Sequence, residues 1–259
     1  MGVDVIKNLK RKYLLDLLKK NERIDGRDFH SFREIEVVPN VIDTAEGSAL
    51  ARIGETQVLA GIKFEIVEPF SSDPELGVFI TNSEFLPLAS SLFEPGPPDE
   101  NSIEFARVVD RGLRSAEVVD LNSFFIEEGK VLGLFLDLYV LDYGGNLFDT
   151  GYLAAMSALL NTKMPKVEDG KIIRGEYKGN LDIKRVVTST TFVKVDEYMI
   201  VDPLLSEELA ADSRLTIAVT DEFVVAMQKG GSGGFKKSDV LKMVDITFDK
   251  RKEIMKYLR

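Results

Sequence analysis

The sequence contains no cysteine, and its only histidine is His30. The absence of cysteine excludes disulfides, zinc–thiolate sites and thiol nucleophiles. A single histidine excludes a histidine metal cluster, and it excludes any Ser-His-Asp triad built on another histidine. His30 itself lies in the polar, turn-like segment RDFHSF, which predicts an ordinary surface residue. We expect no resident metal ion and no cofactor.

Long apolar runs are also missing, since none approaches the roughly 20 residues needed to span a bilayer. Residues 1–20 predict an amphipathic helix rather than a signal peptide, because charges interrupt every apolar stretch. A formal net charge of −10 over 259 residues argues against nonspecific binding to nucleic acid. A local basic surface is still compatible with that charge, because salt screens charges beyond about 10 Å. The cysteine-free composition fits a reducing interior, and we expect a cytoplasmic protein.

Three arginines share one face of a predicted helix in the stretch NSIEFARVVDRGLRSAEVVDL. Arg107, Arg111 and Arg114 are spaced i, i+4 and i+7, which places their guanidinium groups on the same side. The other side is apolar and consists of Phe105, Val108, Val109, Leu113 and Ala116. Arginine suits phosphate because its planar fork donates two hydrogen bonds at once. The row therefore predicts a binding face for an anionic partner.

A second interpretation of this row is a solvated or salt-bridged helix face. Glu104, Asp110 and Glu117 lie near the arginines in sequence and can pair with them along the helix surface. The sequence alone leaves both interpretations open. Asn101 or Ser102 is the expected N-cap of this helix.

Hydrophobic patterning predicts an α+β protein. Alternating runs predict strands at REIEVV, SALARIG and VFITNSEF, and the short GETQ link predicts a hairpin from SALARI into VLAGIKFEIV. The apolar run VLGLFLDLYVLDYGG predicts a strand buried on both faces. The helix expected over residues 4–20 has an apolar stripe of Ile6, Leu9, Tyr13, Leu14, Leu17 and Leu18.

The second part of the chain alternates in the same way. The stretch NLFDTGYLAAMSALLNTKMP predicts a helix that stops before Pro165, and the charged segment 166–182 predicts a loop or a domain crossing. Short strands are expected at RVVTSTTFVKV, EYMIVD, SRLTIAV and FVVAMQKG. A closing amphipathic helix is expected over residues 238–258.

Four motifs follow one another along the chain: RIDGR, GSALARIGETQVLAGIK, ARVVDRGLRSAEVVDL and LYVLDYGGNLFDTGYLAAMSALL. In this order they resemble the RNase PH family, and within it the non-catalytic RNase PH-like subunit of the archaeal exosome. The resemblance implies two βαβα-type halves with mixed sheets and helices packed between them. It implies an N-terminal helix at 1–20, a first half at 21–165 and a second half with the C-terminal helix at 166–259.

Active members of that family degrade RNA from its 3′ end, with inorganic phosphate attacking the terminal linkage. In them a Ser/Thr-Arg pair follows a glycine at the start of the second-half helix and binds phosphate together with the helix N-terminus. The resemblance aligns this pair with Leu147 and Phe148, so neither a hydroxyl nor a guanidinium is present. The next arginine after Arg114 is Arg174, so no nearby arginine replaces the missing one.

The family's acidic motif, a pattern resembling E-D-x-x-x-D-x-D-x-N, is also altered in VDPLLSEELAADSRLTIAV. Glu208 stands where the first catalytic Asp is expected, and Arg214 stands where a later Asp is expected. An arginine there places positive charge where the chemistry needs negative charge. Asp202, Glu207 and Asp212 complete an acidic cluster, for which a solvated loop is expected. These departures predict a subunit without catalytic activity of its own.

The resemblance also implies partners. These are a catalytic RNase PH-like subunit that alternates with this chain in a hexameric ring (a trimer of heterodimers), RNA-binding cap subunits, and single-stranded RNA. Arg107, Arg111 and Arg114 match the arginine-bearing helix of the family and are the expected RNA-binding residues. Candidates for the ring interfaces, with ordinary core as the alternative, are Phe70, Phe93, Phe124 and Phe125.

Two other functions compete with this one. The chain could be an active 3′ exoribonuclease or nucleotidyltransferase that uses Glu208 and Asp212 in a noncanonical site, or a stand-alone interaction module. The Gly-rich segment KGGSGGFKKS suggests a phosphate loop, but Phe235 and Lys237 interrupt the Gly-Lys-Ser/Thr order that such a loop needs. A flexible strand-to-helix turn is expected there.

Overall fold

The computed structural model describes residues 11–258, and it is α+β. A large mixed sheet contains β1 (Ile35–Pro39), β2 (Gly47–Ile53), β3 (Thr56–Val67), β4 (Val78–Phe85), β5 (Phe125–Glu127) and β6 (Lys130–Asp142). Its order is β1-β2-β3-β6-β4, with β5 beside β6 and β4 parallel to β6. A second, antiparallel sheet contains β9 (Thr188–Val195), β10 (Tyr198–Val201), β11 (Ser213–Val219) and β12 (Val224–Gly231). Its order is β10-β9-β11-β12.

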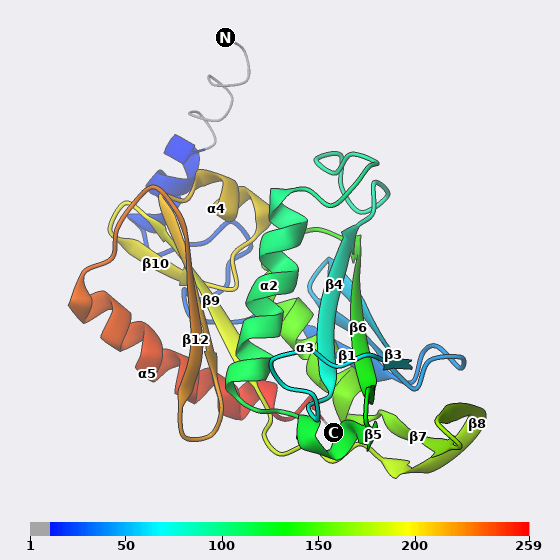
Figure 1. Cartoon of the computed structure of the whole chain (residues 1–259). Coiled ribbons are helices and arrows are strands. Elements are labelled where there is room, and N and C mark those ends of the chain that lie inside the picture. The colour runs from blue at the N-terminus through cyan, green and yellow to red at the C-terminus, as the bar shows by residue number, and fades with distance from the viewer. Residues whose placement is uncertain (1–10, 259) are drawn as a thin grey trace.

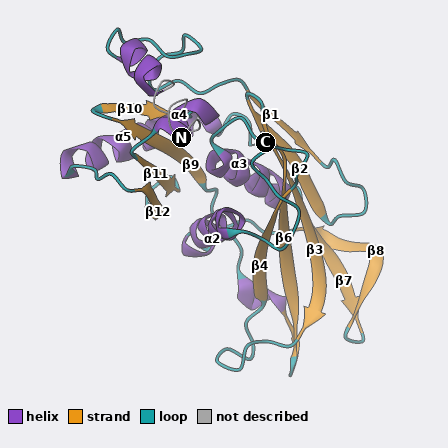
Figure 2. Cartoon of the chain, turned by 90° about the horizontal axis from the view of Figure 1, so that it is seen from above, coloured by secondary structure: helices purple, strands orange, loops and turns teal. Residues whose placement is uncertain are grey.

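The helices form layers around the two sheets. Helices α2 (Glu100–Ser115) and α3 (Leu147–Leu160) lie between the sheets, and α5 (Lys237–Ile254) covers the outer face of the second sheet (Figures 1 and 2). The short helices are η1 (Leu121–Phe124) and α4 (Leu205–Ala210). No helix among residues 11–258 is long and apolar enough to cross a membrane.

Helix α3 is the centre of the molecule. Leu147 to Leu159 are all buried, and the helix contacts β2 and β3 on one side and β9 on the other. It crosses α2 closely, because a Cβ on Gly112 of α2 would lie 2.1 Å from the Tyr152 hydroxyl of α3. That hydroxyl donates a 2.5 Å hydrogen bond to the Val108 carbonyl. The crossing fixes α2, and with it the arginine row, against the core.

Most of the predicted elements are confirmed, including the β2–β3 hairpin, β4, β9 to β12 and α5. The strand β6 is not buried on both faces as expected. Its residues 134, 136, 138 and 140 are fully buried, whereas 135, 137, 139 and 141 are partly exposed. The reason is that α2 and α3 cover only one face of the large sheet.

The charged segment 166–182 is not a loop. It belongs to a hairpin of β7 (Lys163–Glu168) and β8 (Lys171–Asn180). Asp169 and Gly170 both have positive φ (49° and 65°), as a two-residue type I′ turn requires. The Asp-Gly dipeptide was the sequence signal for this hairpin. The many charged residues favoured a loop instead, because β8 is largely exposed to solvent and carries no long apolar run.

The predicted N-terminal helix lies partly outside the described residues, including Ile6 and Leu9. Residues 11–18 are helical, and Leu14 and Leu18 pack against the second sheet. Tyr13 is not on the buried stripe, since it is 62% exposed.

Candidate functional site

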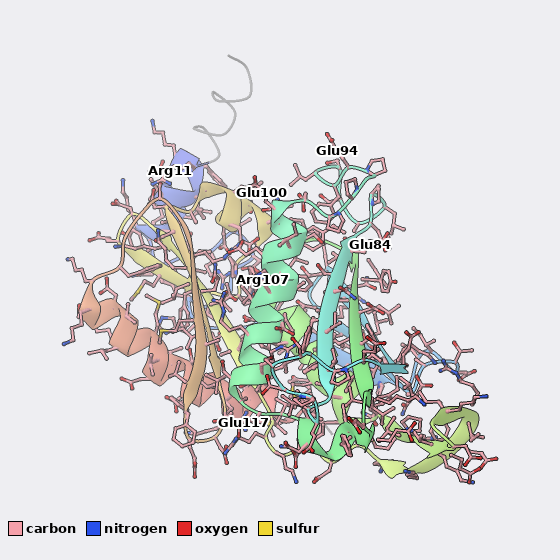
Figure 3. The ribbon with its side chains drawn as sticks, viewed as in Figure 1. Arg11, Glu84, Glu94, Glu100, Arg107 and Glu117 are labelled. Atoms are coloured by element: carbon pink, nitrogen blue, oxygen red, sulfur yellow. The ribbon has the colours of Figure 1, made fainter. Side chains whose placement is uncertain are left out.

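Helix α2 carries the predicted arginine row along its exposed surface. The N-cap is Asp99 rather than Asn101 or Ser102, because the Asp99 carboxylate accepts the Ser102 N–H at 2.8 Å. Figure 3 places Arg107 midway along α2, between Glu100 at its start and Glu117 just past its end.

The three arginines of the row differ in their contacts. Arg114 pairs with Asp110 at 2.8 Å and lies 5.4 Å from the Phe79 ring centroid. Arg111 donates to the Gln228 side-chain oxygen at 3.2 Å, and Arg107 makes no hydrogen bond or ion pair within residues 11–258. The row is thus salt-bridged only in part, at Arg114, and its other two arginines are exposed, so both interpretations of the row remain open. Its role in RNA binding stays a prediction.

The other acidic residues near the row pair elsewhere. Glu117 pairs with Arg185 at 3.3 Å, and Glu104 pairs with Arg214 of β11 at 2.9 Å. Glu104 also accepts the Gln228 side-chain N–H at 2.9 Å. Hydrogen bonds thus connect Arg111 through Gln228 to Glu104 and Arg214.

The start of α3 brings together Leu147, Phe148, Glu208 and Arg214, the four positions that the sequence resemblance predicts to be altered. Leu147 and Phe148 are 7% and 4% exposed and offer no group that can hold phosphate. The Arg214 guanidinium lies 4.4 Å from the Phe148 ring centroid, in a cation–π contact. The Asn146 N–H, at the helix N-terminus, donates to Glu208 at 2.9 Å. The protein's own carboxylate therefore occupies the end of the helix where an anion would bind.

Glu208 is held from two sides, since the Tyr143 hydroxyl also donates to it at 2.8 Å. Burial raises the pKa of Glu208, and hydrogen bonds from Tyr143 and Asn146 and the charge of Arg214 oppose that rise. Burial likewise raises the pKa of Tyr143. Both groups are thus engaged with each other rather than open to a substrate.

These residues line a cleft of about 200 Å³, which we call the aromatic cleft. Its wall is mostly aromatic and apolar, with polar groups from Asn101, Glu104, Glu208 and Arg214. The remaining lining residues are Phe85, Leu92, Phe93, Phe105, Tyr143, Leu147, Phe148 and Leu209. The polar positions could be predicted from the sequence but the aromatic wall could not, because its rings come from segments far apart in the chain.

The acidic cluster is not a solvated loop, because Asp202 and Glu207 are fully buried. Arg23 forms a doubly hydrogen-bonded pair with Glu207 at 2.6 and 3.0 Å, and both side chains are 0% exposed. Arg33 pairs in the same way with Asp202 at 2.7 and 2.9 Å. Buried carboxylates of this kind require cationic partners, and the RIDGR motif and the segment after it supply them.

Arg27, also from the RIDGR motif, contacts the same Asp202 carboxylate, whereas Asp212 lies outside this group of ion pairs. Arg27 pairs with Asp202 at 2.8 Å, whereas Asp212 pairs with Arg11 at 2.9 Å on the other side of α4. The junction ties the chain before β1 to α4 and the loop before it, and we call it the arginine junction (Arg23, Arg27 and Arg33 with Asp202 and Glu207).

Asp149, in the first turn of α3, is a buried acid that sequence reasoning missed. It accepts hydrogen bonds from Ser189, Thr191 and Asn146, and it forms no ion pair with any side chain of residues 11–258. Burial raises the pKa of Asp149 to about 6, against the opposing hydrogen bonds. A lone carboxylate in the apolar stretch LFDTGYLAAMSALL was the available signal.

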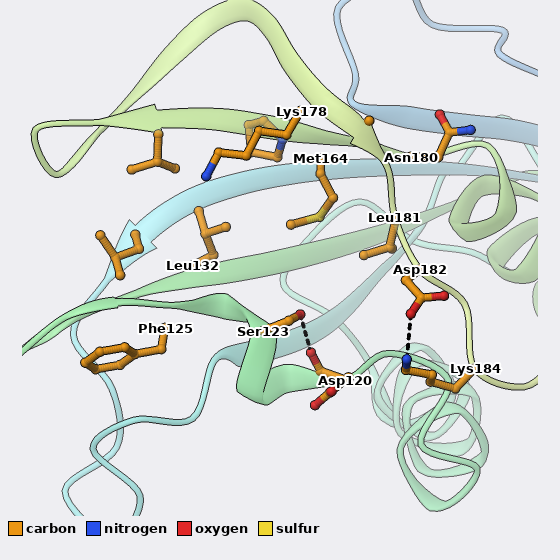
Figure 4. Close-up of a pocket in the computed structure, with 14 residues that line it drawn as sticks. Asp120, Ser123, Phe125, Leu132, Met164, Lys178, Asn180, Leu181, Asp182 and Lys184 are labelled. Atoms are coloured by element: carbon orange, nitrogen blue, oxygen red, sulfur yellow. Dashed lines mark hydrogen bonds and ion pairs between the residues drawn. The ribbon is translucent and has the colours of Figure 1, made fainter.

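Two other features lie away from this cleft. A groove of about 480 Å³ separates β5 from the β7–β8 hairpin; Phe125, Leu132 and Met164 line it, with the Asp182–Lys184 ion pair at 2.5 Å on its rim (Figure 4). The Gly-rich segment is the expected turn from β12 into α5, and Gly231 has a φ of 78° there. His30 is exposed, as expected. Within residues 11–258 no three acidic or histidine side chains are placed to hold a metal ion.

Comparison with known proteins gives the family. Residues 31–165 match the model of the 3′ exoribonuclease family, domain 1, and residues 185–250 match domain 2 of the same family. The exosome complex component Rrp42 of Methanothermobacter thermautotrophicus is 46% identical over 261 residues, covering 99% of this chain and 96% of that protein. The protein of the same name from Thermococcus kodakarensis is 47% identical over 260 residues, covering 97% and 95%.

Solved structures agree with this result. A chain of the Archaeoglobus fulgidus exosome with RNA bound to the active site superposes with a TM-score of 0.91 at 44% identity, covering 98% of this chain and all of that one. A chain of an archaeal exosome core gives a TM-score of 0.87 at 42% identity, with both chains fully covered. The two-domain RNase PH-like fold and the resemblance to archaeal exosome subunits are thus confirmed. This chain belongs to the 3′ exoribonuclease (RNase PH) family.

Proposed function

We propose that the chain is a non-catalytic structural subunit of an archaeal exosome. In this role it alternates with a catalytic RNase PH-like subunit in a hexameric ring, supports that subunit's active site, and helps bind single-stranded RNA for 3′-to-5′ phosphorolysis. RNA-binding cap subunits complete the cytoplasmic complex. Within the chain, residues 21–165 and 166–259 form the two halves, and residues 1–20 lie outside them.

One observation carries the non-catalytic part: the start of α3 is filled by the protein's own groups. Leu147 and Phe148 provide no phosphate ligand, and the Glu208 carboxylate already accepts the Asn146 N–H. Among the described residues that line the cleft, Arg214 supplies the one guanidinium, and it is paired with Glu104 at 2.9 Å. An incoming phosphate would meet two carboxylates, and like charges in a poorly hydrated site repel it strongly.

The arginine row supports the RNA-binding part. Arg107 and Arg111 are exposed and keep most of their donors free, as a site for the phosphates of a single strand requires. Such contacts supply affinity rather than sequence choice. The row lies outside the aromatic cleft, so it is suited to holding a strand that enters a neighbouring subunit's site.

Exposed aromatic residues support the ring contacts. Phe70 and Phe125 are 64% and 43% exposed, and large apolar side chains at oligomer interfaces are typically exposed in the isolated chain. Phe124 is fully buried, so it is core rather than interface. Phe93 stacks on Tyr143 in the wall of the cleft.

An active enzyme that uses Glu208 and Asp212 is the alternative. Its two carboxylates would have to act on one substrate, but they bind different partners. Glu208 accepts from Tyr143 and Asn146, whereas Asp212 pairs with Arg11 and accepts the Asp196 N–H at 2.8 Å.

The test is reconstitution with a catalytic RNase PH-like partner. Mixing should give a particle with the mass of three heterodimers by light scattering, and phosphate-dependent loss of a 3′ single-stranded RNA should appear only in the mixture. A chain that stays monomeric beside its partner would favour a stand-alone interaction module. Release of nucleoside diphosphates by this chain alone would favour the active enzyme.

A further inference from the structure

The loop of residues 86–99, between β4 and α2, exposes large apolar side chains although it is held in place. Ala89 is buried, and its carbonyl accepts the Tyr143 N–H at 3.2 Å. Four of the nine prolines of the chain lie in this loop, and each fixes a backbone angle. Leu88 and Leu92 are nevertheless 76% and 56% exposed. A fixed loop that presents leucines to water is typical of a protein-binding surface, because a partner that covers it removes little conformational freedom.

A groove of about 580 Å³ runs between the end of β4 and this loop, and we call it the loop groove. Phe85, Leu92 and Phe93 line it together with the four prolines of the loop. Glu84 and Glu94 also line it, and both are exposed to solvent. An apolar lining beside exposed charged groups is the composition of a protein–protein interface, with its apolar core and polar rim.

The charge of the chain is concentrated around the loop groove. Residues 64–106 contain nine acidic residues and no lysine or arginine, so this stretch carries −9 of the formal net charge of −10. Figure 3 shows Glu84, Glu94 and Glu100 at the end of the molecule where the loop lies. These three side chains are exposed, and none of them forms an ion pair with another residue in the described range 11–258. Their charges are therefore available to a partner.

The acidic surface continues from the groove onto the large sheet, of which α2 and α3 cover only one face. Strand β4 is an end strand of that sheet, and its Glu84 lies opposite Tyr139 of β6. One pair along, the Asp137 carboxylate accepts the Asn82 amide at 3.1 Å. Burial raises the pKa of Tyr139, and the negative charges of Asp137 and Glu84 raise it further. Since Glu84 belongs to both the groove and this strip of sheet, the two form one continuous surface.

Charge and polarity together select the occupant of this surface. RNA is repelled because its phosphates are anionic, and a second copy of the chain would bring the same acidic surface. Within residues 11–258 no three acidic side chains converge on a point that could hold a metal ion. A protein surface that carries lysine or arginine around an apolar centre complements both the carboxylates and the leucines. The catalytic subunit of the proposed ring is such a partner, because it must carry cations to hold the phosphates of its RNA.

From these observations we propose that the loop groove and the acidic surface around it are the docking surface for a basic, partly apolar surface of the catalytic RNase PH-like partner. Leu88 and Leu92 are the apolar anchors, and Glu84, Glu94 and Glu100 pair with lysine or arginine of the partner. The proposal rests on the proposed function, and it adds where on this chain the partner docks and by what chemistry. Each chain of an alternating ring has two neighbours, and this surface accounts for one of the two contacts.

The test measures the affinity of the full chain for the purified catalytic partner, by calorimetry at low and at high salt. Glu84→Lys combined with Glu94→Lys should weaken binding about tenfold at low salt, and the loss should shrink at high salt because salt screens exposed charges. Leu88→Ser should weaken binding about tenfold at both salt concentrations, since the loss is apolar. The control Asp245→Lys reverses an exposed charge on α5 and should leave binding unchanged. All four side chains are exposed, so thermal unfolding should show that every variant folds.

Each other result has a definite meaning. A wild-type chain that does not bind the partner overturns the proposed function and this proposal with it. If the wild type binds, but the double charge reversal costs no more affinity than Asp245→Lys, the proposed function stands and this docking surface fails. A homo-oligomer of the chain alone that Leu88→Ser dissociates would assign the surface to a second copy and overturn the proposal. Binding of single-stranded RNA by the chain alone that Leu88→Ser abolishes would assign the surface to RNA and overturn it as well.

Discussion

The same residue type has opposite roles on the two sides of α3. In the arginine junction, Arg23 and Arg33 are buried, and each donates to a carboxylate and to backbone carbonyls. In the row on α2, Arg107 and Arg111 are exposed, and their donors are mostly free. The junction uses its donors to hold the chain together, whereas the row keeps them available for a ligand.

Burial explains the difference. A buried guanidinium must be fully paired, because removing it from water costs several kcal/mol that only close partners offset. An exposed arginine gains little from an ion pair, so leaving it unpaired costs almost nothing. The spacing of arginines in the sequence therefore does not distinguish a structural arginine from a binding one. The burial of the arginine and its partners in the fold does distinguish them.

The largest effect is expected in the junction. Glu207→Gln leaves the Arg23 guanidinium buried without a counter-charge, and this should lower the free energy of unfolding by about 3–5 kcal/mol. Glu127→Gln breaks an exposed pair with Lys130 and should cost less than about 1 kcal/mol. Denaturant unfolding measures both. Equal losses for the two variants would mean that burial does not distinguish these arginine contacts.

The next effect is the pH dependence set by Asp149. The pKa of about 6 in the folded protein lies above the usual 3.8, so between these values the folded state binds the proton more tightly than the unfolded state. Asp149 therefore lowers stability as pH rises from about 4 to about 6. The free energy of unfolding of the wild type, relative to that of Asp149→Asn, should fall by roughly 2 kcal/mol over that range. Thermal unfolding from pH 4 to pH 7 measures it, and a constant difference would contradict the account.

A smaller effect is expected for RNA binding by the row. Arg107→Ala or Arg111→Ala should weaken binding of single-stranded RNA by the assembled complex a few-fold. Each lost phosphate contact should also reduce the salt slope of log K by about 0.7. Arg52→Ala removes an exposed arginine on β2 and serves as the control. A slope that falls equally for Arg52 and Arg107 would show only a general charge effect.

The smallest effect is on the stability of the same helix. Arg107→Ala should change the free energy of unfolding by less than about 0.5 kcal/mol, because the side chain has no partner among residues 11–258. Arg114→Ala should cost slightly more, up to about 1 kcal/mol, since it loses the Asp110 pair and the Phe79 contact. The midpoints of denaturant unfolding measure both changes, provided that the m-value is the same for the variants and the wild type. A larger loss of unfolding free energy for Arg107→Ala than for Arg114→Ala would show that Arg107 stabilises the fold and is not a free binding residue.

The sequence predicted the features that depend on local patterns. The spacing of Arg107, Arg111 and Arg114 and the β2–β3 hairpin follow from helix and strand periodicity alone. The motif order located Leu147, Phe148, Glu208 and Arg214, which the structure brings to one place. Charge patterning failed at Asp202 and Glu207, because their arginine partners lie about 170 residues or more away in sequence.

The aromatic cleft was beyond sequence reasoning for the same reason. Phe85 ends a strand, Phe93 lies in a loop, Phe105 lies on α2 and Tyr143 precedes α3, so no window of the sequence contains them together. Their proximity follows from the close crossing of α2 and α3 and from the place of β4 beside β6. Only the tertiary fold reveals that Phe148 ends a series of aromatic rings in contact with one another.

The proposed function requires that the start of α3 in this chain cannot use phosphate. The most direct measurement is the release of nucleoside diphosphates from a 3′ single-stranded RNA by the isolated chain at saturating inorganic phosphate, with Glu208→Gln measured beside it. The account predicts no phosphate-dependent release from either protein, and release once the catalytic partner is added. Release by the isolated chain that disappears in Glu208→Gln would contradict it.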